Sequence, residues 1–173
     1  WQNYLNTHPS NPVQWLVVPR HPQRVTEVEQ LIASHGFLVS RRSSWHSQAD
    51  IFSATSTSTN KPVILLGDSL GEMALYYSLS DVALLGGSFE SLGGQNLIEA
   101  AACACPIVMG PHTFNFAEAS QAALATGAAM RAENMAMALE SAVALAQDVP
   151  RLNTHSENAK RFASEHGGAT QRT

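Results

Sequence analysis

Short apolar runs and amphipathic segments alternate along most of the chain. The apolar runs predict β-strands at residues 14–18, 37–40, 63–66, 82–85, 106–109 and 128–131. Apolar side chains at helical spacing predict α-helices at residues 24–35, 73–78, 96–105, 116–126, 134–147 and 151–165. Pro150 is expected to separate the last two helices. This alternation predicts an α/β fold, a parallel sheet with helices on both faces.

The composition is that of one globular domain. Of the 173 residues, 45% are hydrophobic and 14% charged, and no segment resembles a linker, so we expect a single domain over residues 1–173. The formal net charge of −4 and the pI near 5.9 offer no basic surface to a nucleic acid. No apolar run approaches the length of a membrane span. The sequence lacks an initial Met and a signal-peptide pattern, which indicates a cytosolic protein or a piece of one.

Two further segments are predicted to be structural. Residues 41–60 are polar and rich in Ser and Thr, so we expect a mobile surface excursion with one short helix or turn at residues 48–52. Cys103 and Cys105 lie two apart at a predicted helix end, where their side chains diverge. We therefore expect two small buried residues, without a disulfide or a shared metal.

Two pairs of glycines follow the strand predicted at residues 82–85. The candidate ligand-binding residues of this stretch are Gly86, Gly87, Ser88, Gly93, Gly94, Asn96 and Glu99. Glycines let a ligand approach the backbone, and the next helix start offers unpaired N–H groups, so the stretch suits a phosphate. Glu99 is then expected to bind a ribose diol, with Asn96 facing the phosphate. The alternative is structural, since N-x-x-E is close to a capping box that serves the helix itself.

Loops after two other predicted strands carry further candidates. Arg20 and His21 follow the first strand, and an Arg side chain there suits a phosphate or carboxylate, although a solvated surface Arg is the simpler interpretation. The sequence from Ser69 to Glu72 is S-x-x-E, for which we favour a capping box. Gly71, with the N–H groups beside it, is a candidate for lining a base or sugar pocket.

The loop at residues 110–116, GPHTFNF, has an unusual mixture of polar and aromatic side chains before a predicted helix. Thr113 or Asn115 is expected to cap that helix, unless the loop serves a ligand. The chain has no G-x-S-x-G elbow, no H-E-x-x-H motif and no D-x-D pair to hold a divalent cation against a diphosphate. We therefore expect neither a metal nor a cofactor.

Four ordered motifs resemble the carboxyl-terminal half of the Kdo transferases of lipopolysaccharide synthesis (Kdo is 3-deoxy-D-manno-oct-2-ulosonic acid). The motifs are VPRHPQR at residues 18–24, LLGDSLGEM at 65–73, LLGGSFESLGGQNLIEAA at 84–101 and MGPHTFNF at 109–116. The resemblance implies a Rossmann-like domain, the C-terminal half of a GT-B type glycosyltransferase, that binds the donor CMP-Kdo. The family often has His and Pro where this chain has Gln95 and Ala100, but neither difference removes a candidate contact.

The resemblance also implies how the candidate residues work. The residues expected to contact the donor are Arg20, His21, Gly71, Glu72, Gly86, Gly87, Ser88, Gly93, Gly94, Asn96 and Glu99. Arg20 and the glycine N–H groups would stabilise the charge on the departing phosphate without a metal. In the family, the lipid A precursor binds the N-terminal domain at the cytoplasmic face of the bacterial inner membrane, and that domain also holds the acidic residue regarded as the general base.

That N-terminal domain has no counterpart in these 173 residues. We therefore expect the isolated domain to be a soluble monomer that binds CMP-Kdo and catalyses nothing alone. Two other interpretations stay open. One is a UDP-sugar-dependent transferase or nucleotide-sugar epimerase of the same architecture, and the other is a stand-alone nucleotide-binding module.

Overall fold

The computed structural model of the chain describes residues 1–8, 13–46 and 62–167. The chain divides into two compact units, Trp1–Glu72 (unit 1) and Met73–Thr173 (unit 2). Among the described residues, no helix combines the length and the apolar character that crossing a bilayer requires.

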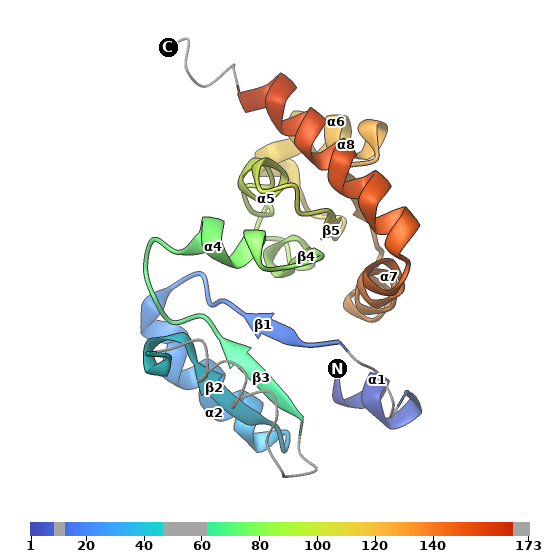
Figure 1. Cartoon of the computed structure of the whole chain (residues 1–173). Helices are drawn as coiled ribbons and strands as arrows, with labels where there is room; N and C mark the ends of the chain where they lie inside the picture. The colour runs from blue at the N-terminus through green and yellow to red at the C-terminus, as the bar shows by residue number, and fades with distance from the viewer. Residues whose placement is uncertain (9–12, 47–61, 168–173) are drawn as a thin grey trace. The chain divides into compact units, whose positions relative to one another are not determined.

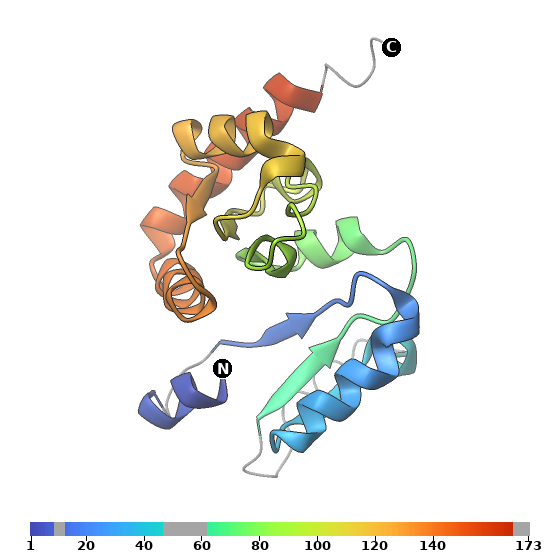
Figure 2. The same cartoon turned by 180° about the vertical axis from the view of Figure 1, so that it is seen from behind.

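Unit 1 is built on a three-stranded parallel sheet with the strand order β1-β3-β2 (Figure 1). Its elements are α1 Gln2–Thr7, β1 Trp15–Val17, η1 Pro22–Arg24, α2 Val25–Ser34, β2 Leu38–Arg41, η2 Arg42–Ser44 and β3 Val63–Leu66. Helix α2 lies along one face of the sheet, as the reverse view shows (Figure 2). Among the described residues of this unit, the buried apolar ones are Val25, Phe37, Ile64 and Leu66. Because the strands are parallel, β1, β2 and β3 end at the same edge.

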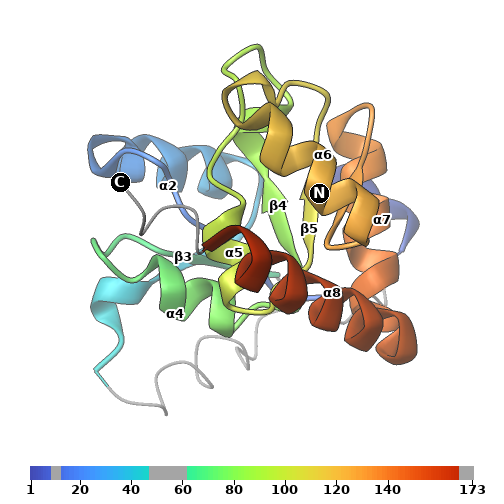
Figure 3. The same cartoon turned by 90° about the horizontal axis from the view of Figure 1, so that it is seen from above.

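Unit 2 has its own three-stranded parallel sheet, with the order β4-β5-β6. Its elements are α4 Met73–Ser78, β4 Ala83–Leu85, η3 Gly86–Ser88, α5 Ile98–Ala102, β5 Ile107–Met109, η4 Phe114–Phe116, α6 Ala117–Thr126, β6 Ala129–Arg131, α7 Met135–Gln147 and α8 Val149–Gly167. Helices α5, α6, α7 and α8 surround β4 and β5 (Figure 3). Strand β5 is buried along its whole length, as a central parallel strand must be.

Local sequence signals explain where the helices of unit 2 begin and end. Helix α6 stops at Gly127, whose φ of 73° lies in the left-handed region that favours glycine. Asn134 caps α7, because its Oδ1 accepts a hydrogen bond from the Met137 N–H at 3.0 Å. Asp148 Oδ1 does the same for the Arg151 N–H at 3.1 Å, at the start of α8.

The structure corrects two predictions and adds one helix. Pro150 does not delay the last helix: α8 begins at Val149, and Pro150 occupies its first turn, where no backbone N–H is needed. Helix α1 was not predicted. Arg41 ends β2 and residues 42–44 form η2, so the predicted mobile excursion does not begin at residue 41. The short helix or turn predicted at residues 48–52 lies outside the described residues.

Candidate functional site

Arg20 and His21 lie in the loop after β1 in unit 1, as predicted. Both are exposed, and within the described part of the chain neither side chain has a hydrogen-bond partner. The Arg20 guanidinium is therefore available to an anion. The His21 carbonyl accepts the Arg24 N–H at 3.0 Å, so the backbone there turns into η1 and then α2. Contact of either residue with the donor stays a prediction.

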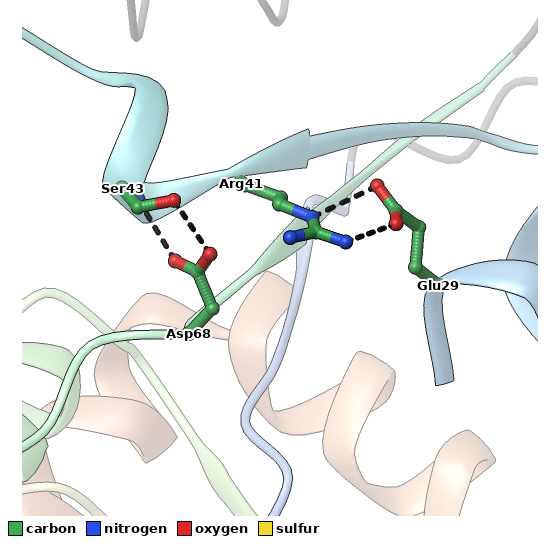
Figure 4. Close-up of polar contacts among 4 residues, drawn as sticks. All are labelled: Glu29, Arg41, Ser43 and Asp68. Atoms are coloured by element: carbon green, nitrogen blue, oxygen red, sulfur yellow. Dashed lines mark hydrogen bonds and ion pairs between the residues drawn. The ribbon is translucent and has the colours of Figure 1, made fainter. Parts of the chain in front are cut away.

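The loop of residues 67–72, which follows β3, is fastened to the turn that follows β2. Asp68 accepts two hydrogen bonds from Ser43, one from the N–H at 2.8 Å and one from the hydroxyl at 2.6 Å (Figure 4). Arg42 donates to Glu72 Oε1 at 2.9 Å, and Ser69 donates its hydroxyl to Glu72 Oε2. The Ser69 hydroxyl thus binds the Glu72 side chain, and the capping box expected at residues 69–72 stays a prediction.

Arg41 joins the same turn to helix α2. Its guanidinium donates to both carboxylate oxygens of Glu29, with Nε 2.9 Å from Oε1 (Figure 4). Hydrogen bonding to Arg41 lowers the pKa of Glu29, and the Glu29 carboxylate raises the pKa of Arg41. Consecutive residues at the end of β2 therefore hold three places in unit 1: Arg41 holds α2, Arg42 holds Glu72, and Ser43 holds Asp68.

In unit 2, the loops after β4 and β5 lie together at the edge where these strands end. Ser88 joins them: its buried hydroxyl donates to the Leu85 carbonyl at 2.5 Å and accepts the Gly110 N–H at 2.7 Å. The Ser88 carbonyl also accepts the His112 N–H at 2.9 Å. The hydroxyl of Ser88 is therefore occupied within the protein, and any contact with a ligand stays a prediction.

The second glycine pair packs closely against the loop at residues 110–116. Gly93 has a φ of 85°, and a Cβ there would lie 2.2 Å from Asn115 Nδ2. Gly94 has a φ of 86°, and its Cβ would lie 3.3 Å from the His112 carbonyl oxygen. These two positions require glycine for the chain's own packing. Gly86 differs, because its φ is ordinary and a Cβ would meet no atom within 4 Å.

Thr113 and Asn115 do not cap helix α6, contrary to the structural alternative proposed for them. Neither the η4 nor the α6 start has a side-chain cap. Asn115 Nδ2 instead donates to the Leu92 carbonyl at 3.2 Å, and Thr113 Oγ1 accepts a hydrogen bond from Arg131 at 3.2 Å. Arg131 also donates to the Pro111 carbonyl at 3.1 Å. Both side chains therefore tie loops together, and Arg131 at the end of β6 is a contributor that the sequence analysis missed.

Asn96 and Glu99 lie at the start of helix α5 and are hydrogen-bonded to each other. Asn96 Oδ1 accepts the Ile98 N–H at 3.0 Å, which serves the start of α5, and Asn96 Nδ2 donates to Glu99 Oε1 at 3.0 Å. Glu99 is exposed. Burial, and then the Glu99 carboxylate, raise the pKa of Tyr77 to about 12. The pair thus serves its own helix while Glu99 presents a carboxylate at the surface.

The backbone amide of Gly87 has a partner within the protein. The Gly87 N–H donates to Gln95 Oε1 at 3.3 Å.

The two cysteines do not form a disulfide. Cys103 and Cys105 are free thiols that donate to different carbonyls, those of Ala74 and Ser80. Burial raises the pKa of Cys105 to about 12, as expected of an inert core residue. Among residues 1–8, 13–46 and 62–167, no three His, Cys, Asp or Glu side chains are grouped as metal ligands.

Comparison with known proteins shows which of them this chain resembles. No family model matches it. The 3-deoxy-D-manno-octulosonic acid transferase of Bordetella pertussis is 45% identical over 159 residues, which are 91% of this chain and 35% of that protein. The transferase of the same name from Haemophilus influenzae is 36% identical over 128 residues, 74% of this chain and 28% of that protein. This chain is a homologue of the 3-deoxy-D-manno-octulosonic acid transferases.

A solved structure agrees with this homology to the Kdo transferases. The crystal structure of the C-terminal CMP-Kdo binding domain of WaaA from Acinetobacter baumannii matches with a TM-score of 0.74 and 28% sequence identity. The match covers 92% of this chain and 77% of that one. The resemblance and the α/β fold with parallel strands are therefore confirmed. The chain spans only about a third of the length of its curated Kdo transferase relatives, at 35% and 28%.

Proposed function

We propose that this chain is the donor-binding domain of an inverting glycosyltransferase that transfers Kdo from CMP-Kdo to lipid A precursor in lipopolysaccharide biosynthesis. The similarity to a CMP-Kdo binding domain over 92% of the chain is the observation that carries the proposal. The Kdo transferases that match it in sequence support the same conclusion. No observation in the described residues favours a UDP-sugar enzyme or a stand-alone module.

Each unit offers groups of the right chemistry for a nucleoside monophosphate. In unit 1 the exposed Arg20 guanidinium suits the phosphate, since it is planar and always charged. In unit 2 the exposed Glu99 carboxylate suits the two hydroxyls of a ribose, and the open backbone at Gly86 suits a close approach to an anion. Groups of these kinds bind phosphate and ribose and stabilise charge on a leaving group.

In the proposed reaction, a hydroxyl oxygen of the acceptor forms a bond to the anomeric carbon of Kdo. The bond from that carbon to the phosphate oxygen breaks, and CMP leaves with the electron pair. The proton of the acceptor hydroxyl passes to a general base, which we place in the part of the longer protein that this chain does not span. Attack from the face opposite CMP inverts the anomeric configuration. The protein would work at the cytoplasmic face of the inner membrane, where its acceptor lies.

Isothermal titration calorimetry of the 173-residue chain with CMP, UMP and AMP tests the proposal. Cytosine and uracil differ in the exocyclic group on C4 and in whether ring N3 carries a proton. Losing one hydrogen bond at these positions costs about 1.4 kcal/mol, so CMP is expected to bind about tenfold more tightly than UMP. Equal affinities for the three nucleotides, or no binding, would remove cytidine recognition. In a separate titration with UDP, tighter binding than that of CMP would favour the UDP-sugar alternative.

A further inference from the structure

We propose that the Arg42–Glu72 ion pair, together with the Asp68–Ser43 hydrogen bonds, is a positioning device for the donor. The device holds the backbone of residues 67–72 in one conformation, and Glu72 acts through it without contacting the nucleotide. This inference rests on the proposed function, and it gives Glu72 a different role from the direct donor contact expected of it. All four residues belong to unit 1.

The anchors bracket a part of the loop that has little packing of its own. Leu70 is 80% exposed, and a Cβ on Gly71 would meet no atom within 4 Å, although its φ is 77°. Side-chain packing around Gly71 therefore does not fix this left-handed conformation. The hydrogen bonds of Asp68 on one side and Glu72 on the other hold the loop at its two ends.

The Glu72 carboxylate is committed to the protein. Oε1 accepts from Arg42 and Oε2 accepts from Ser69, so each oxygen already has a donor. A hydrogen bond to a ribose or base would compete with a charge-assisted bond, which is roughly twice as strong as a neutral one. Glu72 is better suited to fix the loop than to bind the donor directly.

Burial separates this ion pair from an ordinary surface pair. The Arg42 and Glu72 side chains are each 29% exposed, whereas those of Arg24 and Glu27, a pair within the η1–α2 segment, are 58% and 65% exposed. Exposed pairs contribute little, because water and salt screen them. Arg42 also donates to the Trp45 carbonyl, and its guanidinium lies 5.8 Å from the Trp45 ring centroid, which orients it further. Arg24–Glu27 is therefore a matched control with no link to the loop.

A double-mutant cycle on CMP binding tests the inference. We expect Arg42→Gln and Glu72→Gln each to weaken CMP binding about tenfold, and the double variant to bind no more weakly than either one, because both remove the same ion pair. Arg24→Gln should change the affinity by less than about twofold. Additive losses at Arg42 and Glu72 would mean that Glu72 contacts the nucleotide, and an unchanged affinity in Arg42→Gln would overturn the inference directly.

Amide hydrogen exchange at residue 43, whose N–H donates to Asp68 Oδ1 at 2.8 Å, is measured by NMR without nucleotide and separates loop positioning from nucleotide contact. Exchange should accelerate at least about tenfold in Arg42→Gln and in the milder variant Ser43→Ala, which serves if Arg42→Gln does not fold. Unchanged exchange in folded variants would overturn the inference. If the unaltered chain does not bind CMP, the proposed function fails together with the donor role. If it binds CMP and the variants behave like it, only the inference fails.

Discussion

At the residue scale, glycines that look alike in the sequence serve different needs. Gly93 and Gly94 have positive φ angles and lie against residues 112–115, so the fold of unit 2 itself requires them. Gly86 has an ordinary φ and open space where a Cβ would be, so nothing in the described residues explains a glycine there. A ligand that approaches the Gly86 backbone would explain it. The sequence motif alone did not separate these two reasons, because both produce a Gly-Gly pair after a strand.

Alanine substitution should separate the two kinds of glycine. Gly93→Ala should lower the free energy of unfolding by at least about 1–2 kcal/mol, because a Cβ is strained at positive φ and meets Asn115. Gly86→Ala should change it by less than about 0.5 kcal/mol. The same Gly86→Ala variant should weaken CMP binding by about tenfold, since a Cβ would stand where the phosphate approaches. Urea denaturation followed by far-UV circular dichroism, with calorimetry, measures both quantities. Unaltered CMP binding in Gly86→Ala would exclude a close approach there.

At the element scale, most helices and strands were predictable because apolar periodicity is local information. Residues 63–66 and 73–78 form β3 and α4 with the predicted bounds. Helix α8 was predicted to begin at residue 151, because proline usually interrupts a helix. Proline is tolerated in the first turn of a helix, however, and Pro150 lies there. The role of residues 41–43 was missed because a Ser- and Arg-rich sequence resembles a solvated loop. Residues 41–43 are held in place by contacts with residues distant in the sequence, namely Glu29, Asp68 and Glu72, and these contacts are visible only in the structure.

The ion pair between α2 and β2 makes a prediction about pH. Arg41 lowers the pKa of Glu29, so the pair's contribution to stability is fully present above the ordinary Glu pKa of about 4.3 and is lost as the pH falls through the lower value of the folded protein. Glu29→Gln should therefore reduce the free energy of unfolding at pH 7 by about 1 kcal/mol or less, because the pair is about one-third exposed. The difference between the two proteins should shrink as the pH falls below about 4.

Tryptophan fluorescence gives a clean measurement of this effect. The three tryptophans of the sequence, Trp1, Trp15 and Trp45, all belong to unit 1, which also contains Glu29 and Arg41. Urea titrations of the unaltered chain and Glu29→Gln between pH 3 and pH 7 should show the converging stabilities. Arg24→Gln is a suitable comparison, because it removes an equivalent but more exposed pair. A stability difference that grows toward low pH would contradict the assigned direction of the Glu29 shift.

At the scale of the whole molecule, we assign only the donor-binding part of the proposed reaction to this chain. The chain is 45% identical to a Kdo transferase but spans 35% of it, and the match to a CMP-Kdo binding domain covers 92% of the chain. Arg20 and Glu99 are exposed and the backbone at Gly86 is open, so these candidates suit anions and hydroxyls chemically. The sequence offered the helix-start role of Asn96 as an alternative, but it did not reveal that Ser88 holds two loops together.

This division predicts that the 173-residue chain binds the donor without transferring it. Incubated with CMP-Kdo and lipid A precursor, the chain should release CMP no faster than a protein-free control, because we place the general base and the acceptor site in the remaining two-thirds of the relatives' length. Chromatographic measurement of CMP, with mass spectrometry of the lipid, follows the reaction. The titration with CMP serves as the matched control, since binding with no transfer is the expected pair of results. Kdo-modified lipid formed by the chain alone would show that a base lies within these residues, and the exposed Glu99 would then be the first to replace with Gln.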